Sequence, residues 1–278
     1  MDAASREQFG WTLHESGPEG ANHTVLLLPG ALATAAFYDD LLDERKVKDA
    51  SIRFVATTLP GFGGTPAPDD VSVENYARVA GTIAAELGCD AVVGHSLGAN
   101  VAIEMVAGGA FSGPVILLAP SFSRVDESKF PRALDRLSSM FGHVPYALML
   151  KIIGPAMKSS LPPHRREVLI GELQKNNPRF LRRQTRVYLE YLDRHGSLAG
   201  RLCESRVRAR VVFGEHDEIG LTDDERELLE QCPSVTLVTI ADAGHSRSTR
   251  SRARSPTSSL TPSKTEAIAK RSRADYQR

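Results

Sequence analysis

Six short runs of consecutive apolar residues, separated by turns rich in Gly and Pro, restrict this chain to a small set of folds. A strand with one solvated face alternates apolar and polar residues, whereas these runs do not, so they suit a sheet that is covered on both faces. The runs are HTVLLLPG at 23–30, IRFVATTLPG at 52–61, DAVVGHS at 90–96, PVILLAP at 114–120, ARVVFGE at 209–215 and VTLVTIA at 235–241. We therefore expect an α/β fold with a mostly parallel central sheet flanked by helices.

Two of the intervening segments have the patterns of covering helices. After Ser72, which is suited to an N-cap, apolar residues recur with a 3.6-residue period from Val73 to Leu87, and Gly88 is the expected stop. The stretch LGANVAIEMVAGG after Ser96 is apolar on nearly all sides. A helix of that kind is expected to be buried against a central strand.

The segment from Pro120 to about Arg206 has no strand pattern. It contains helical, basic stretches interrupted by Pro, such as ALDRLSSMF, YALMLKIIG and RRQTRVYLEYLDRHG, and the strand pattern resumes at Val207. The segment is therefore inserted within an α/β domain, where an added helical layer is expected to act as a lid. The predicted division is a core part at 1–120, a lid at 121–206 and a second core part at 207–245.

The last segment, 246–278, differs in composition from the rest of the chain. It is rich in Ser, Thr, Pro and Arg, with nine basic and two acidic residues, and it has almost no large apolar side chain. Such a segment cannot offset its ordering entropy by burial, so we expect a disordered basic tail. Contact with nucleic acid or an acidic partner, and an altered natural C-terminus, are the alternatives.

The bulk composition excludes several classes of protein. Lys plus Arg equals Asp plus Glu at 34 each, so no overall charge favours nucleic acid or an anionic membrane. No apolar stretch has the length of a signal peptide or a bilayer span, so neither secretion nor membrane insertion is expected. Cys89, Cys203 and Cys232 are odd in number and lack metal-ligand spacing, which favours a cytoplasmic protein with small buried thiols and no metal.

Residues 94–98 carry a pattern typical of nucleophilic catalysis. Gly94, His95, Ser96, Leu97 and Gly98 fit G-x-S-x-G, in which a serine occupies a strained turn between a strand and a helix. Glycines are needed there because the two backbones approach closely. The pattern follows an apolar run and begins an apolar helix, so Ser96 is the candidate nucleophile.

With this motif, the chain resembles the α/β-hydrolase superfamily over about residues 10 to 245. LLLPG resembles the strand end whose following turn supplies an oxyanion-hole amide, and LPGFGGT at 59–65 resembles the glycine-rich turn after the next strand. Pro29 and Leu59 depart from the His and Asp that relatives often carry, but both lie outside the proton-transfer machinery. The resemblance implies the α/β-hydrolase fold and an oxyanion hole made by the backbone N–H groups of Ala31 and Leu97.

A serine hydroxyl needs a base to accept its proton and a carboxylate to orient that base. Asp217 in GEHD resembles the acid turn of the superfamily, and His245 in DAGHS resembles its histidine loop; the order Ser, Asp, His agrees as well. Asp217 could instead cap a helix and His245 could be an ordinary loop residue. The weaker candidates for the acid are Glu215, Glu218 and Asp242. We interpret His95 and His216 as packing or loop residues, and His164 and His195 as exposed lid residues.

The expected activity is that of a serine hydrolase. Ser96 would form an acyl-enzyme with a small or medium hydrophobic carboxylic ester, without cofactor or metal, and the small-molecule substrate would be the main partner. An apolar acyl pocket is expected from the lid residues Phe122, Phe130, Leu134, Met140, Phe141, Tyr146, Met149, Ile152, Met157 and Leu161.

Other activities remain open because a fold does not determine a function. The same triad in this superfamily also serves thioester, amide and C–C bond hydrolysis and cofactor-free peroxidation, so a related acyl substrate is an alternative to an ester. A non-catalytic ligand-binding or interaction protein is a further alternative, since relatives place a helix after the histidine loop and this chain has only a short AIAKRS segment there.

Overall fold

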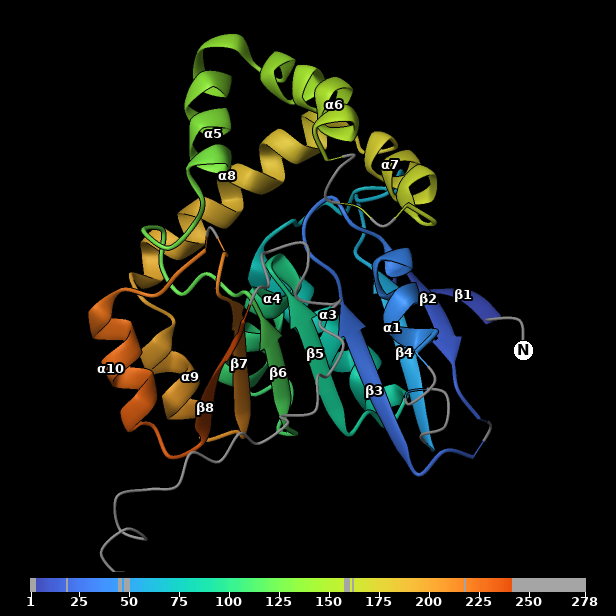
Figure 1. Cartoon of the computed structure of the whole chain (residues 1–278), viewed down its shortest axis with the longest axis vertical. Helices are drawn as coiled ribbons and strands as arrows, with labels where there is room; N and C mark the ends of the chain where they lie inside the picture. Colours follow the sequence, from blue (N-terminus) through green and yellow to red (C-terminus); the bar gives the residue numbers. More distant parts are fainter. Residues whose placement is uncertain are drawn as a thin grey trace, which may run out of the picture.

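The computed structural model describes residues 4–18, 20–44, 47, 51–157, 161, 163–217 and 219–241, and these contain one eight-stranded sheet in the order β1-β2-β4-β3-β5-β6-β7-β8 (Figure 1). The pairs β1–β2 and β2–β4 are antiparallel, and all other neighbours are parallel. The strands are β1 (Ala4–Gln8), β2 (Trp11–Ser16), β3 (His23–Leu28), β4 (Ile52–Thr58), β5 (Ala91–His95), β6 (Val115–Leu118), β7 (Ala209–Gly214) and β8 (Val235–Ile240). The predicted mostly parallel sheet is confirmed.

Each of the six apolar runs forms a strand, and β1 and β2 are additional. The pattern of continuous apolar residues did not predict these two. In β2 the fully buried residues, Trp11 and Leu13, alternate with partly exposed ones, and β1 is made mostly of polar residues. β1 is the edge strand and β2 lies next to it; both belong to the antiparallel part of the sheet, where one-sided burial is common.

The strand order places a switch point at the middle of the sheet. β3 pairs with β4 on one side and with β5 on the other, so the chain crosses over between β4 and β5. Ligands of open α/β sheets bind at the carboxyl ends of strands where the order reverses in this way. Leu28 and Gly94 pair at these ends, so Ala31 and Ser96 follow neighbouring strands.

The helices predicted on either side of β5 are present and pack together. They are α3 (Val73–Glu86) and α4 (Leu97–Ala107). The Ser72 side chain accepts a hydrogen bond from the Asn75 N–H at 3.2 Å, as expected of an N-cap. In α4 every residue from Leu97 to Val106 is buried, because the helix lies between the sheet, α3 and α9.

A smaller core covers the opposite face of the sheet. This smaller core contains Leu27, Ala35, Tyr38 and Ala56. Leu26 and Leu28 instead belong to a larger core on the other face of the sheet, because successive side chains of a strand point to opposite faces. The Tyr38 hydroxyl donates to the Leu28 carbonyl at 2.7 Å. The short helices η1 (Ala35–Tyr38) and α1 (Asp39–Leu42) provide this cover.

The described residues between β6 and β7 form helices and no strand. The helices are α5 (Lys129–Phe141), α6 (Val144–Met157), α7 (Arg166–Gln174), α8 (Pro178–His195) and α9 (Ala199–Ser205). Figure 1 shows α5 to α8 as a layer beyond one end of the sheet. In contrast, α9 packs beside the sheet against α4 and α10 (Asp223–Gln231).

No helix in the described part of the chain is both long and apolar enough to cross a membrane. All three cysteines are free thiols; Cys232 is buried, whereas Cys89 and Cys203 are half-buried.

Candidate active site

Ser96 occupies a strained turn at the carboxyl end of β5. Its backbone has φ 49° and ψ −118°, a conformation that L-residues rarely adopt and that costs about 1–3 kcal/mol. The turn is held by three backbone hydrogen bonds: Ser96 N–H donates to the Leu118 carbonyl at 2.9 Å, and the Ser96 carbonyl accepts from Ala99 at 2.8 Å and Asn100 at 3.1 Å. The surrounding structure therefore compensates for the strain, as at other functional turns.

The two glycines of the motif are required by close backbone contacts. A Cβ on Gly94 would lie 2.3 Å from the Gly98 carbonyl oxygen, and a Cβ on Gly98 would lie 2.2 Å from the Leu28 carbonyl oxygen. A third glycine, Gly30, passes so near that its Cβ would be 3.2 Å from the Ser96 Cβ. No larger residue fits at Gly94 or Gly98 without moving α4 away from the sheet.

Ala31 and Leu97 lie beside Ser96 at the same pocket. Leu97 is the first residue of α4, and the N–H groups in the first turn of a helix have no acceptor within the helix. The positive end of the helix dipole also lies there. The two backbone N–H groups thus come from the ends of neighbouring strands, β3 and β5.

Asp217 lies in a tight turn after β7. Its Oδ2 accepts from the Gly214 N–H at 2.6 Å, and its own N–H donates to the Gly214 carbonyl at 3.1 Å, so the turn fixes the carboxylate. The alternative acid Glu215 is exposed. His245, Glu218 and Asp242 lie outside the described residues, as does the tail at 246–278.

The other histidines serve different purposes. His95 is 6% exposed and its ring stacks on Phe37 with centroids 4.6 Å apart, in agreement with a packing role. His164 is exposed and lies 3.1 Å from the Asp40 carboxylate. For His195 the expectation of an exposed position is wrong: it is half-buried at the end of α8, edge-on to Tyr191 at 4.8 Å. Desolvation lowers the pKa of His195.

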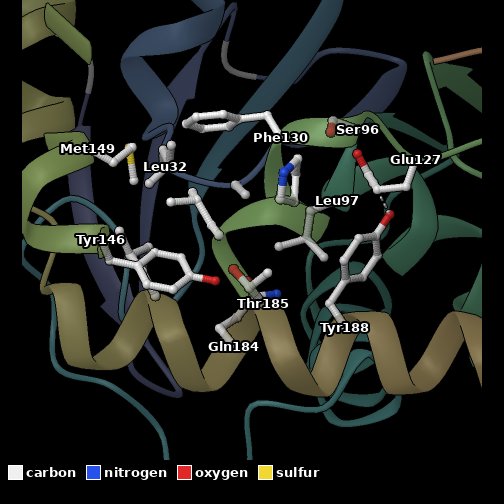
Figure 2. A pocket seen from close by; sticks show the side chains of 14 residues that line it. Leu32, Ser96, Leu97, Glu127, Phe130, Tyr146, Met149, Gln184, Thr185 and Tyr188 are labelled. Carbon is white, nitrogen blue, oxygen red and sulfur yellow. Dashed lines mark hydrogen bonds between the residues drawn. The ribbon is translucent and has the colours of Figure 1, made fainter. Parts of the chain in front are cut away.

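A cavity of about 120 Å³ opens beside Ser96 under the helical layer (Figure 2). It is lined by Ala31, Leu32, Ser96, Leu97, Glu127, Phe130, Pro131, Leu134, Tyr146, Met149, Leu181, Gln184, Thr185 and Tyr188. Its walls come from α5, α6 and α8, so residues far apart in sequence enclose Ser96.

The lining agrees in part with the apolar lid residues expected from the sequence. Four of them reach the cavity, namely Phe130, Leu134, Tyr146 and Met149. Phe122 is buried in the core, and the exposed surface holds Met140, Phe141 and Ile152 instead. The polar lining residues Glu127, Gln184, Thr185 and Tyr188 were missed, because nothing in the local sequence distinguishes them from surface residues of a loop or a helix.

No metal centre is formed by the described residues, where no group of three or more His, Cys, Asp or Glu side chains could hold an ion.

Comparisons with known proteins agree on one superfamily. Several solved structures share the fold. An N-acyl homoserine lactonase complexed with N-butanoyl homoserine has a TM-score of 0.66 and 18% identity, over 100% of this chain and 98% of that one. A putative lipase from Acinetobacter baumannii has a TM-score of 0.68 and 16% identity, over 88% of this chain and 85% of that one, and an esterase from Exiguobacterium antarcticum has a TM-score of 0.66 and 15% identity, over 89% and 93%. No curated protein sequence matches. The model of the alpha/beta hydrolase family matches residues 25–254. The chain therefore belongs to the alpha/beta hydrolase family.

Proposed function

We propose that this chain is a serine hydrolase that cleaves a small or medium hydrophobic carboxylic ester. The observation that supports this proposal is the strained turn of Ser96, which the packed glycines of the motif hold at the edge of a mostly apolar cavity. Strain of this kind persists where the surrounding structure holds it in place, and it clusters at sites of function. Family membership supports a hydrolase, and the cavity supports an ester with an apolar acyl group.

In the proposed mechanism, the Ser96 Oγ attacks the ester carbonyl carbon while His245 takes the hydroxyl proton. Asp217 orients His245 and stabilises its protonated ring. The negative charge on the carbonyl oxygen is received by the backbone N–H groups of Ala31 and Leu97. The C–O bond to the alcohol then breaks, and His245 gives its proton to that oxygen. Water repeats these steps on the acyl-enzyme and releases the acid.

The cavity limits the size of the acyl group. Its volume of about 120 Å³ is slightly smaller than an engineered cavity of about 150 Å³ that binds benzene. A short acyl chain fits within it, and the segment 121–206 serves as a lid over the bound ester. The lid would exclude water from the acyl-enzyme and so strengthen the electrostatic interactions at Ser96.

Labelling with a fluorophosphonate tests this proposal, together with hydrolysis of p-nitrophenyl acetate, butyrate and octanoate. An N-acyl homoserine lactone belongs in the panel because a lactonase structure covers the whole chain. The wild type should label and should prefer butyrate to octanoate, and Ser96→Ala should abolish labelling and reduce turnover by at least about 10³-fold. Ser139→Ala, at an exposed position of α5, is the matched control and should change neither. A folded wild type that neither labels nor hydrolyses any substrate would favour the binding-protein alternative.

A further inference from the structure

One wall of the cavity carries a buried acidic side chain that the proposed mechanism does not use. Glu127 lies in the link between β6 and α5 and is 7% exposed. Among the 14 described residues that line the cavity, no other is Asp, Glu, Lys, Arg or His. Ser96 lines the same cavity, and Figure 2 shows the Tyr188 side chain of α8 reaching the Glu127 carboxyl group. An acid in this place would contact a substrate close to the reacting bond.

Three donors hold the Glu127 carboxylate. Its Oε2 accepts from the Ser121 hydroxyl and the Tyr188 hydroxyl, both at 3.0 Å, and its Oε1 accepts from the Ser128 N–H at 2.9 Å. A carboxylate offers about four acceptor positions, so one position on Oε1 remains for a ligand. None of the ion pairs between described residues includes Glu127.

The same network ties Glu127 to α4, the helix that follows Ser96. Asn100, one turn into α4, donates from Nδ2 to the Ser121 carbonyl at 2.6 Å and accepts from the Ser121 N–H at 3.4 Å. Desolvation raises the pKa of Tyr188 well above its usual value, so its hydroxyl keeps its proton and remains a donor. Glu127 and Ser96 therefore belong to one rigid frame, as residues of a preorganised site do.

The surroundings of Glu127 favour a positively charged ligand. A buried carboxylate without a counter-charge is unfavourable unless hydrogen bonds or a cation compensate for its lost hydration. The rest of the cavity offers apolar and neutral polar side chains, and in such surroundings the attraction between opposite charges is stronger than in water. A carboxylate on the substrate would be repelled for the same reason.

We propose that Glu127 binds an ammonium group on the acyl part of the substrate, so that the preferred ester is that of a short amino acid. This inference rests on the proposed function, because it concerns the ester that Ser96 attacks. The small cavity requires the ammonium group to lie within a few bonds of the ester carbonyl. Glu127 is then a specificity residue and takes no part in proton transfer.

Three phenyl esters of nearly equal length test the proposal, namely those of β-alanine, butyric acid and the succinic monoester. They place an ammonium, a methyl or a carboxylate group at the same distance from the carbonyl. At pH 7 the kcat/KM of the wild type for the β-alanine ester should be at least about tenfold above that for the butyrate ester. The succinic monoester should have the lowest kcat/KM of the three. Glu127→Gln should reduce the ammonium-to-methyl ratio of kcat/KM to about one.

Glu190→Gln is the matched control, because it removes an exposed acid from the same helix as Tyr188. It should leave the ratio unchanged. A loss of packing alone would lower turnover of all three esters together and would not change their ratio. A wild-type ratio near one, or an equal ratio in wild type and Glu127→Gln, overturns the proposal even when the butyrate ester is hydrolysed at Ser96.

Binding of propylammonium separates this proposal from the proposed function. Titration calorimetry should detect binding to the wild type at least tenfold tighter than binding of propionate, whether or not any ester is hydrolysed. Should Glu127→Gln fail to fold, this comparison on the wild type decides the question. Equal or absent binding of the two ions overturns the Glu127 site, and absent turnover of all esters with intact propylammonium binding overturns the hydrolase instead.

Discussion

Gly98 shows how one missing Cβ can set the geometry of the turn at Ser96. Because a Cβ there would lie 2.2 Å from the Leu28 carbonyl oxygen, Gly98→Ala must push α4 away from β3. We expect a loss of about 1–3 kcal/mol in the free energy of unfolding, typical of overpacking. Fluorophosphonate labelling should fall by about a hundredfold, since a shift of 1 Å can cost that much in rate. Urea unfolding and labelling rate measure the two effects.

Gly171→Ala provides the contrast for this prediction. Gly171 lies inside α7 and a Cβ there would meet nothing within 4 Å, so the substitution should stabilise the protein by up to about 1 kcal/mol. Labelling should be unchanged. Equal behaviour of the two variants would mean that the contact of Gly98 with β3 is unimportant.

Among single residues, the sequence predicted those whose placement depends on the local backbone conformation. The glycines and the serine of residues 94–98 form a local pattern, and the strained turn follows from it. Glu127 could not be found in the same way, because its neighbours in the cavity come from α4 and α8, nearly thirty residues before it and sixty after it. His195 was misplaced for a related reason, since one of its neighbours is distant in sequence: the Glu74 carboxylate of α3 lies 4.0 Å from its Nε2.

Helices α4, α8 and α9 are joined by one ion pair between the half-buried Arg201 and the nearly buried Glu104. Arg201 of α9 contacts Glu104 of α4 through both guanidinium nitrogens, and the Tyr191 hydroxyl of α8 donates to the same carboxylate at 2.8 Å. Removing the cation leaves a nearly buried carboxylate without its partner, so Arg201→Met should destabilise the protein by about 2–4 kcal/mol. Thermal and urea unfolding measure this change.

The double variant Glu104→Gln with Arg201→Met tests whether the unpaired charge causes the loss. It should recover at least half of the stability, because no carboxylate is then left uncompensated. A double variant as unstable as the single one would point to lost packing of the Arg201 side chain instead.

Whole elements were predicted best where one property repeats along the chain. Six apolar runs became six strands because parallel strands are buried on both faces. The antiparallel strands β1 and β2 lack that property, and the sequence alone did not predict them. The positions of α5, α6 and α8 over Ser96 depend on contacts between distant residues, so the cavity was predicted in character but not in its lining.

At the scale of the whole molecule, a pair of carboxyl groups links the segment after β6 to α10. Asp126 and Glu225 are both nearly buried and hydrogen-bond to each other. The Ser123 N–H and hydroxyl donate to Asp126, and the Thr222 and Ser197 hydroxyls donate to Glu225. Burial opposes the charge on both groups. Burial and the neighbouring Glu225 raise the pKa of Asp126 to about 7, while its hydrogen bonds lower the pKa of Glu225.

The shared proton makes stability depend on pH in a predictable direction. An unfolded Asp loses its proton near pH 4, whereas Asp126 keeps it up to about pH 7. The contribution of Asp126 to the free energy of unfolding is therefore complete below pH 4, declines as the pH rises and is lost above pH 7. The contribution of Glu225 to the free energy of unfolding is already complete above about pH 5. The free energy of unfolding should thus fall between pH 5 and 8.

Asp126→Asn, which keeps an amide donor for Glu225, should flatten this slope, and Asp69→Asn at an exposed position should not. Urea unfolding at several pH values measures the slope, and an unchanged slope in Asp126→Asn would show that the proton resides elsewhere.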